Sequence, residues 1–225
     1  MNRAGIAYQR VPGVDGRKMS AEELRKGYSP VRFFVSQGHR PTVAEVACAM
    51  SHRKCWIRLL EDGDELGAVF EDDMLVDPSA YELAYAQVQA DDDSAKPKVW
   101  LLSARNRVKD PGGKAVVRLL DTANDVMGTW GGEGYFLNAA AAKKLVGIQS
   151  PVRYVADSWS AYARLGVEIS VVFPTACRVD EVPSVIARCR TGIKAKMWYR
   201  HLEWKMQKVF FWLDMALHRV LKGVW

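Results

Sequence analysis

Apolar and polar residues follow one another along the chain in patterns that predict helices and strands in turn. Apolar residues recur at helical spacing over residues 42–60, and Thr42 and Glu45 at the start of this stretch have the form of a helix capping box. A second capping box, Ser20 with Glu23, predicts a short helix from residue 20. Short apolar runs with the character of buried strands lie at residues 66–70, 99–102 and 167–173.

Further helices are predicted between and after these strands, at residues 79–89, 139–146 and 157–165. Residues 91–94 have the composition of a solvated loop, and residues 105–134 are polar and contain glycines. Because strands alternate with helices, we expect an α/β fold in which helices are layered around one sheet.

Composition permits one compact domain. A chain of 225 residues with 49% hydrophobic content can bury a sizeable core, which we expect within residues 1–190. No segment resembles a signal peptide or an apolar run long enough to span a bilayer, so a cytoplasmic or peripheral location is expected. The four cysteines show no CxxC spacing and are interpreted as reduced thiols.

The positive charge is concentrated in the last segment, residues 191–225. From Lys194 onward this tail has seven lysines and arginines against Glu203 and Asp214, an excess of five out of the net charge of +6. Its apolar residues fall on one side of a predicted helix, with tryptophans interspersed. The pattern predicts an interfacial helix on an anionic membrane surface. A terminal helix docked on the domain or on a second copy is the alternative.

The first candidate functional residues are three consecutive acids at the end of the first predicted strand, Glu71, Asp72 and Asp73. Their mutual repulsion costs free energy unless a cation or a positive partner offsets it. A divalent metal is one explanation, since a metal at a strand end neutralises the diphosphate of a nucleotide-sugar donor. A solvated acidic turn is the other.

Three ordered blocks resemble glycosyltransferase family 25, which builds bacterial lipopolysaccharide and lipooligosaccharide cores and includes β-galactosyltransferases. The blocks are residues 45–56, with the pair Ser51-His52; residues 69–73, an apolar run into Glu-Asp-Asp; and residues 134–145, followed by Asp157. With shorter matches at both ends, the resemblance covers roughly residues 10–187. It implies a GT-A-like α/β sandwich that binds a nucleotide sugar and transfers the sugar with inversion.

The resemblance also implies roles for individual residues. Glu71 and Asp73 match the outer positions of the metal-binding triplet and would hold Mn²⁺ or Mg²⁺, while Asp72 would face the ribose or the donor sugar. Ser51 and His52 match the family's Ser-His pair and would bind the donor. For His52 the alternative is a packing role within its helix.

An inverting transfer needs a general base. Asp157 matches the family's downstream aspartate and is the first candidate, although it could instead cap the helix that follows. Glu133 is the second candidate, because residues 130–134 are placed to form an acceptor loop. A plain connecting loop fits that segment equally well.

Members of the family usually open with a strand that precedes the point where this chain begins. We therefore expect either a start further upstream or a truncated copy that lacks the first strand. The leading hypothesis is a metal-dependent glycosyltransferase that moves a sugar, with galactose favoured, from a UDP-sugar to a lipid-linked saccharide. The alternative is a degenerate, non-catalytic copy that binds a membrane or a partner. No nucleic-acid motif is present, and no nucleic acid is expected as a partner.

Overall fold

The computed structural model describes residues 6–179, except residues 38, 104–107, 109–111, 121–128 and 130. The predicted tail at residues 191–225 lies outside the described residues. The described chain forms two compact units, one of residues 6–12, 52–147 and 157–179, and one of residues 13–51 and 148–156. Their boundary falls within helix α3 (Val43–Asp62), between Ser51 and His52. Among the described residues, no helix combines the length and apolar character needed to cross a bilayer.

The first unit is built on a mixed five-stranded sheet in the order β1-β5-β3-β6-β4. Strands β3 and β6 are parallel, and the other neighbouring pairs are antiparallel. The strands are β1 (Leu66–Phe70), β3 (Lys98–Leu101), β4 (Val116–Leu119), β5 (Gly134–Asn138) and β6 (Glu168–Phe173). Three of them match the predicted strands, and the fold is mixed α/β as expected.

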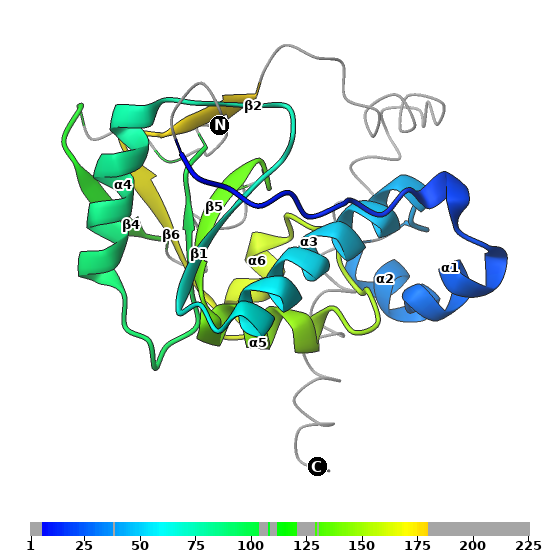
Figure 1. The fold of residues 1–225 in the computed structure, drawn as a ribbon. Coiled ribbons are helices and arrows are strands. Elements are labelled where there is room, and N and C mark those ends of the chain that lie inside the picture. The colour runs from blue at the N-terminus through cyan, green and yellow to red at the C-terminus, as the bar shows by residue number, and fades with distance from the viewer. Residues whose placement is uncertain are drawn as a thin grey trace, which may run out of the picture. The chain divides into compact units, whose positions relative to one another are not determined.

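Helices cover both faces of this sheet (Figure 1). Trp100 and Phe136 are register partners and pack with Ala84 and Val88 of α4 (Pro78–Asp91). Side chains alternate across a strand, so Tyr135 points to the opposite face, where its ring meets Trp159 of α6 (Trp159–Arg164). Helix α5 (Ala139–Ile148) follows β5 directly. The helices predicted at residues 79–89, 139–146 and 157–165 are thereby confirmed within two residues.

Strand β5 was not predicted as a strand, although it is central to the sheet. All five of its residues are buried, because it pairs with β1 on one side and β3 on the other. Strand β4 also lies within the polar, glycine-containing region 105–134, where no strand was predicted; as an edge strand it leaves three of its four residues exposed. A two-stranded ribbon of β2 (Met74–Val76) and β7 (Cys177–Val179) completes the unit.

The second unit contains α1 (Ala21–Gly27), α2 (Pro30–Gln37), the 3₁₀ turn η2 (Gly16–Lys18) and the first part of α3. Both predicted capping boxes are formed: Ser20 and Glu23 exchange side-chain and backbone hydrogen bonds, and so do Thr42 and Glu45. The core of this unit consists of buried apolar residues from α2, α3 and the segment after α5: Phe33, Ala49, Val152, Val155 and Ala156.

Asn138 joins three parts of the first unit at the end of β5. It is 1% exposed, and its Oδ1 accepts hydrogen bonds from the backbone nitrogens of Lys98 (3.1 Å) and Ala141 (2.9 Å). Its Nδ2 donates to Asp92 Oδ1 and to the carbonyl of Lys96, both at 2.8 Å. The segment predicted as a solvated loop, residues 91–94, is thus tied to the sheet, because its acids accept hydrogen bonds from side chains of β3 and β5.

We expect Asn138→Ala to lower the free energy of unfolding by about 2–4 kcal/mol, since it removes a helix cap and leaves buried polar groups without partners. Urea denaturation of the full chain measures this loss. Lys143→Ala on the exposed side of α5 is the control, with an expected change within about 0.5 kcal/mol. A loss of the same size in both variants would contradict the cross-linking role of Asn138.

Candidate functional site

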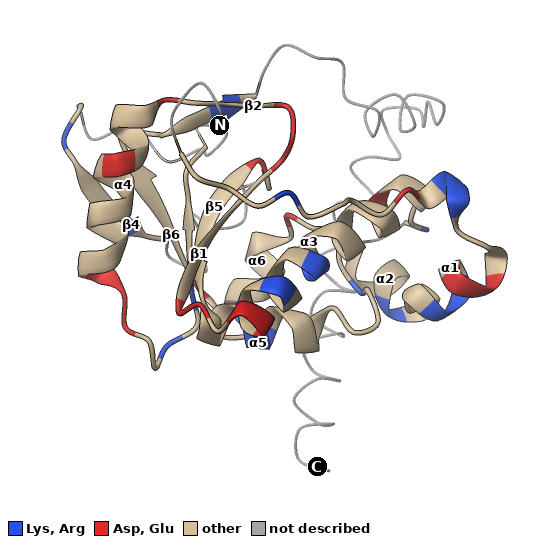
Figure 2. Cartoon of the chain, viewed as in Figure 1, with Lys and Arg blue, Asp and Glu red and all other residues tan. Residues whose placement is uncertain are grey.

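The three consecutive acids form the turn that leaves the main sheet. Glu71 follows β1 directly, and its backbone N–H donates to the carbonyl of Glu133 at 2.9 Å, which continues the β1–β5 ladder by one step. Asp72 and Asp73 complete the turn into β2, and Figure 2 shows this acidic turn in red. Asp72 is exposed, whereas Glu71 and Asp73 are half-buried. The predicted strand ending in carboxylates is confirmed as local structure.

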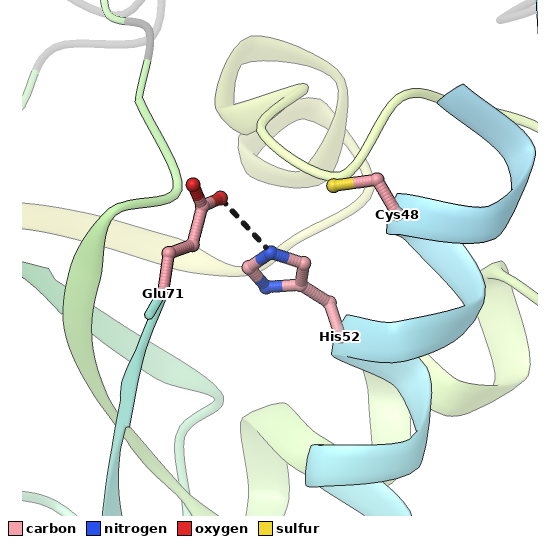
Figure 3. Close-up of side chains that lie close together, drawn as sticks. All are labelled: Cys48, His52 and Glu71. Atoms are coloured by element: carbon pink, nitrogen blue, oxygen red, sulfur yellow. Dashed lines mark hydrogen bonds and ion pairs between the residues drawn. The ribbon is translucent and has the colours of Figure 1, made fainter. Parts of the chain in front are cut away.

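His52 contacts Glu71 from helix α3. Its Nε2 lies 3.3 Å from Glu71 Oε1, and the ring is 5% exposed (Figure 3). Cys48, also drawn in Figure 3, stands one turn earlier on the same helix and carries a free thiol. The helix therefore carries His52 to the first of the three acids, a contact that the sequence had not indicated. Donor binding by His52 stays a prediction.

The other nitrogen of His52 belongs to a buried hydrogen-bond chain. Tyr135 Oη lies 2.8 Å from His52 Nδ1 and 2.8 Å from Trp56 Nε1. An indole N–H only donates, so the Tyr135 oxygen accepts from Trp56. Burial raises the pKa of Tyr135, which keeps the phenol protonated, and its O–H is left to donate to His52 Nδ1.

This chain of partners determines the tautomer of the neutral His52 ring. With Nδ1 acting as the acceptor, the ring proton resides on Nε2, and Nε2–H donates to Glu71 Oε1. The Tyr135 ring is also stacked on the imidazole, with centroids 5.8 Å apart and an interplanar angle of 15°. Both ring orientation and tautomer are thus set by residues that do not face Glu71 themselves.

A buried glycine turn adjoins this pair. Gly131 has φ +111°, a conformation that favours glycine, and a Cβ there would overlap the Glu133 carboxylate. A Cβ on Gly132 would lie 3.3 Å from His52 Cε1 and 3.4 Å from Glu71 Oε1, so Gly132 packs directly on the pair. Glu133 itself is 4% exposed.

The charge of Glu133 also affects a neighbouring thiol. The pKa of Cys177 on β7 is raised to about 12, first by burial and second by the negative charge of Glu133. Cys177 is therefore a neutral thiol at ordinary pH. Its free state, like those of Cys48 and Cys55, agrees with the expectation of reduced cysteines for the described part of the chain.

Asp157 lies near the same turn and does not cap the helix that follows it. The N-cap of α6 is Ser158, whose side chain makes no capping hydrogen bond, and Asp157 Oδ2 accepts a hydrogen bond from Gly131 N at 3.0 Å. The structure thus brings Glu71, His52, Glu133 and Asp157 into the neighbourhood of residues 131 and 132, although these four are widely separated in the sequence.

Ser51 has structural hydrogen bonds. Its Oγ donates to the carbonyl of Ala47 and accepts from the backbone N–H of Val14, each at 2.8 Å. Donor binding by Ser51 stays a prediction that must coexist with both contacts. Glu45 occupies its capping box, as the sequence indicated.

Sequence reasoning missed the residues that support the site. Tyr135 and Trp56 stand inside two of the matched blocks, yet a lone aromatic residue in an apolar run carries no signal beyond packing. Trp159 was missed for the same reason, whereas Gly131 lay within the segment 130–134 that the sequence marked as a candidate acceptor loop. Only the pairing of β1 with β5 and the placement of α3 and α6 on one face reveal their hydrogen bonds.

Carboxylate oxygens are the donors that suit Mg²⁺ and Mn²⁺, so Glu71 and Asp73 fit such an ion by chemistry. The family model described as glycosyltransferase family 25 (LPS biosynthesis protein) matches residues 1–159 of the chain. No curated protein matches the chain. The matched span includes every residue of the candidate site up to Asp157.

We expect the imidazole of His52 in Tyr135→Phe to exchange between its two neutral tautomers, because the variant lacks the O–H that donates to Nδ1. Two-dimensional ¹H–¹⁵N spectra of the imidazole should show one protonated and one unprotonated nitrogen in the wild type, and averaged nitrogens in the variant. Tyr85→Phe removes an exposed hydroxyl elsewhere on the unit and serves as the control. An unaltered His52 pattern in Tyr135→Phe would contradict the assignment.

Proposed function

This chain belongs to glycosyltransferase family 25, a family of lipopolysaccharide biosynthesis, and on that premise we propose that it transfers a sugar from a UDP-sugar donor to a lipopolysaccharide-type saccharide, with galactose the favoured sugar. Family membership implies glycosyltransferase activity, with a nucleotide-sugar donor and a saccharide acceptor. The observation that carries the proposal further is the contact between buried His52 and half-buried Glu71 at the start of an acidic turn. If His52 only packed in the core, its partner carboxylate would not need to be the first of three consecutive acids.

We assign Glu71 and Asp73 to hold Mn²⁺ or Mg²⁺, with Asp72 facing the ribose or the donor sugar. The ion, when bound, would neutralise charge on the donor diphosphate as the nucleotide leaves. The protein's own part is orientation. His52 Nε2–H holds one oxygen of Glu71, and the backbone bond from Glu71 to Glu133 holds the main chain at the same residue. Exposed Asp72 lies where a donor can reach it from solvent.

Transfer with inversion requires a base that takes the proton of the acceptor hydroxyl while the nucleotide leaves from the opposite face of the sugar. Glu133 and Asp157 are the carboxylates proposed for this step. Both lie against Gly131, one through its side chain and the other through a hydrogen bond to the peptide nitrogen. Their common position supports the assignment of the turn at residues 131–133 to the acceptor side of the site.

The tail at residues 191–225 is proposed to bind an anionic membrane surface, which would place the enzyme beside a lipid-linked acceptor. Its excess of lysine and arginine and its tryptophans support this proposal. The location proposed on this basis is the inner face of the cytoplasmic membrane.

In the presence of Mn²⁺ we expect the full chain to hydrolyse a UDP-sugar or to transfer its sugar. Asp73→Ala should raise the Mn²⁺ concentration needed for half-maximal activity by at least about tenfold, because an oxygen ligand of the ion is lost. Asp64→Ala removes an exposed aspartate at the other end of β1 and should leave the metal dependence within about twofold. Product release at several Mn²⁺ concentrations gives the comparison.

Equal metal dependence in Asp73→Ala and the wild type would reject the metal assignment. Calorimetric titration of the wild type with UDP and Mn²⁺ tests the non-catalytic alternative. No binding, together with no turnover of any UDP-sugar, would favour the non-catalytic alternative.

We expect the full chain to co-sediment with vesicles that contain anionic lipid, and to be released as salt rises, because exposed charges are screened. Replacing Lys205 and Lys208 by glutamate should reduce binding severalfold, whereas Lys143→Glu on α5 should not. Equal binding to neutral vesicles would contradict an electrostatic role of the tail, and retention on DNA but not on vesicles would favour nucleic acid.

A further inference from the structure

Both polar groups of the Gly131 residue are held by residues at the start of α6. The N–H of Gly131 donates to Asp157 Oδ2 at 3.0 Å, and its carbonyl accepts from Trp159 Nε1 at 2.8 Å. Trp159 is fully buried, so its indole can move little. The two partners are two residues apart in the chain, and both hold the same residue.

The Asp157 carboxylate has no second structural task at its own helix. Helix α6 begins at Trp159, and the contact nearest to a cap is a backbone bond from Trp159 N to the Asp157 carbonyl at 2.8 Å. A carboxylate that accepts from a backbone N–H makes a charge-assisted hydrogen bond, which is shorter and stronger than a neutral one. The side chain is therefore directed at the glycine turn rather than at α6.

The residue held in this way determines where the following two residues lie. Gly131 has φ +111°, and beyond it Gly132 packs on His52 and Glu71. Glu133 then enters the sheet, where its carbonyl accepts from Glu71 N at 2.9 Å. A change at the Gly131 peptide would turn the Glu133 side chain, because residues 131 and 132 have no side chains that could anchor the turn themselves.

We propose that Asp157 is a positioning residue: its carboxylate fixes the Gly131 peptide and thereby places Gly132 and Glu133 beside the His52–Glu71 pair. Trp159 acts with it through the Gly131 carbonyl. This inference rests on the proposed glycosyl transfer and narrows it, since the proton of the acceptor hydroxyl is then taken by Glu133. Asp157 contributes a hydrogen-bond acceptor and takes up no proton.

Amide substitutions separate the two roles. Asp157→Asn keeps an oxygen that can accept from Gly131 N–H but cannot act as a base, whereas Asp157→Ala loses both properties. Glu133→Gln makes the same carboxylate-to-carboxamide change at the other candidate. The pair Asp157→Asn and Glu133→Gln is therefore a matched comparison of two carboxylates at one turn.

We expect Asp157→Asn to lower kcat by less than Asp157→Ala does, because its amide oxygen can still accept from Gly131 N–H, and Glu133→Gln to lower kcat by about 10²–10⁴-fold, the usual contribution of a general base. Asp157→Ala should lower kcat by at least about tenfold with a smaller change in the donor KM. Trp159→Phe, which keeps the ring and removes the N–H, should lower kcat in the same direction. A fall of 10²-fold or more in Asp157→Asn, equal to that in Asp157→Ala, would overturn the proposal and make Asp157 the base.

A second measurement does not depend on activity. Amide exchange of Gly131 in the full chain, followed by NMR, should be about tenfold faster in Asp157→Ala than in the wild type and little altered in Asp157→Asn. If no donor is turned over by the wild type, the proposed function fails, and Gly131 exchange alone then decides the positioning role. Unaltered Gly131 exchange in a folded Asp157→Ala would overturn the positioning role. If Asp157→Ala does not fold, Asp157→Asn decides. Gly131 exchange as slow as in the wild type then supports the role, and faster exchange overturns it.

Discussion

The pairing of β1 with β5 is the constraint on which the candidate site depends. The register sets Phe70 opposite Gly134, and one further step joins the backbone of Glu71 to that of Glu133. Two carboxylates that lie 62 positions apart by their residue numbers are thereby held at one end of the sheet. A shift of the register by one residue would turn every side chain of the strand to the other face and would separate Tyr135 from His52. Central burial of β5 makes such a shift costly, because all five of its residues pack on neighbours.

Around this pairing, aromatic side chains provide polar contacts as well as burial. Trp56 and Trp159 are fully buried, and each uses its indole N–H, the first on the Tyr135 oxygen and the second on the Gly131 carbonyl. A buried indole needs such a partner, so the position of its acceptor is restricted too. The same core residues that stabilise the sheet therefore orient His52 and the glycine turn. Substitutions that preserve volume but remove the N–H affect orientation more than packing.

The acidic turn illustrates how negative charge can be tolerated at a strand end. His52 offers a hydrogen bond to Glu71, and Asp72 remains in solvent, so the folded chain reduces part of the repulsion by itself. A divalent ion, as proposed, would act on the carboxylates of Glu71 and Asp73 together. The family to which the chain belongs supplies the chemical setting for that proposal. In the proposed transfer Glu133 takes the proton of the acceptor hydroxyl, and Asp157 holds the turn that places Glu133.

Local patterns were sufficient for much of the fold. The capping boxes at Ser20 and Thr42, the helical spacing in α3 and the apolar run of β1 act through contacts only a few residues apart, so the sequence determined them by itself. It also marked Glu71, His52 and Asp157 through their family motifs. Only the tertiary structure decided that β5 is a central strand, that Asp157 faces Gly131 and that Tyr135 sets the tautomer of His52. These features depend on strand pairing and on contacts between residues far apart in the chain, for which no local spacing carries a signal.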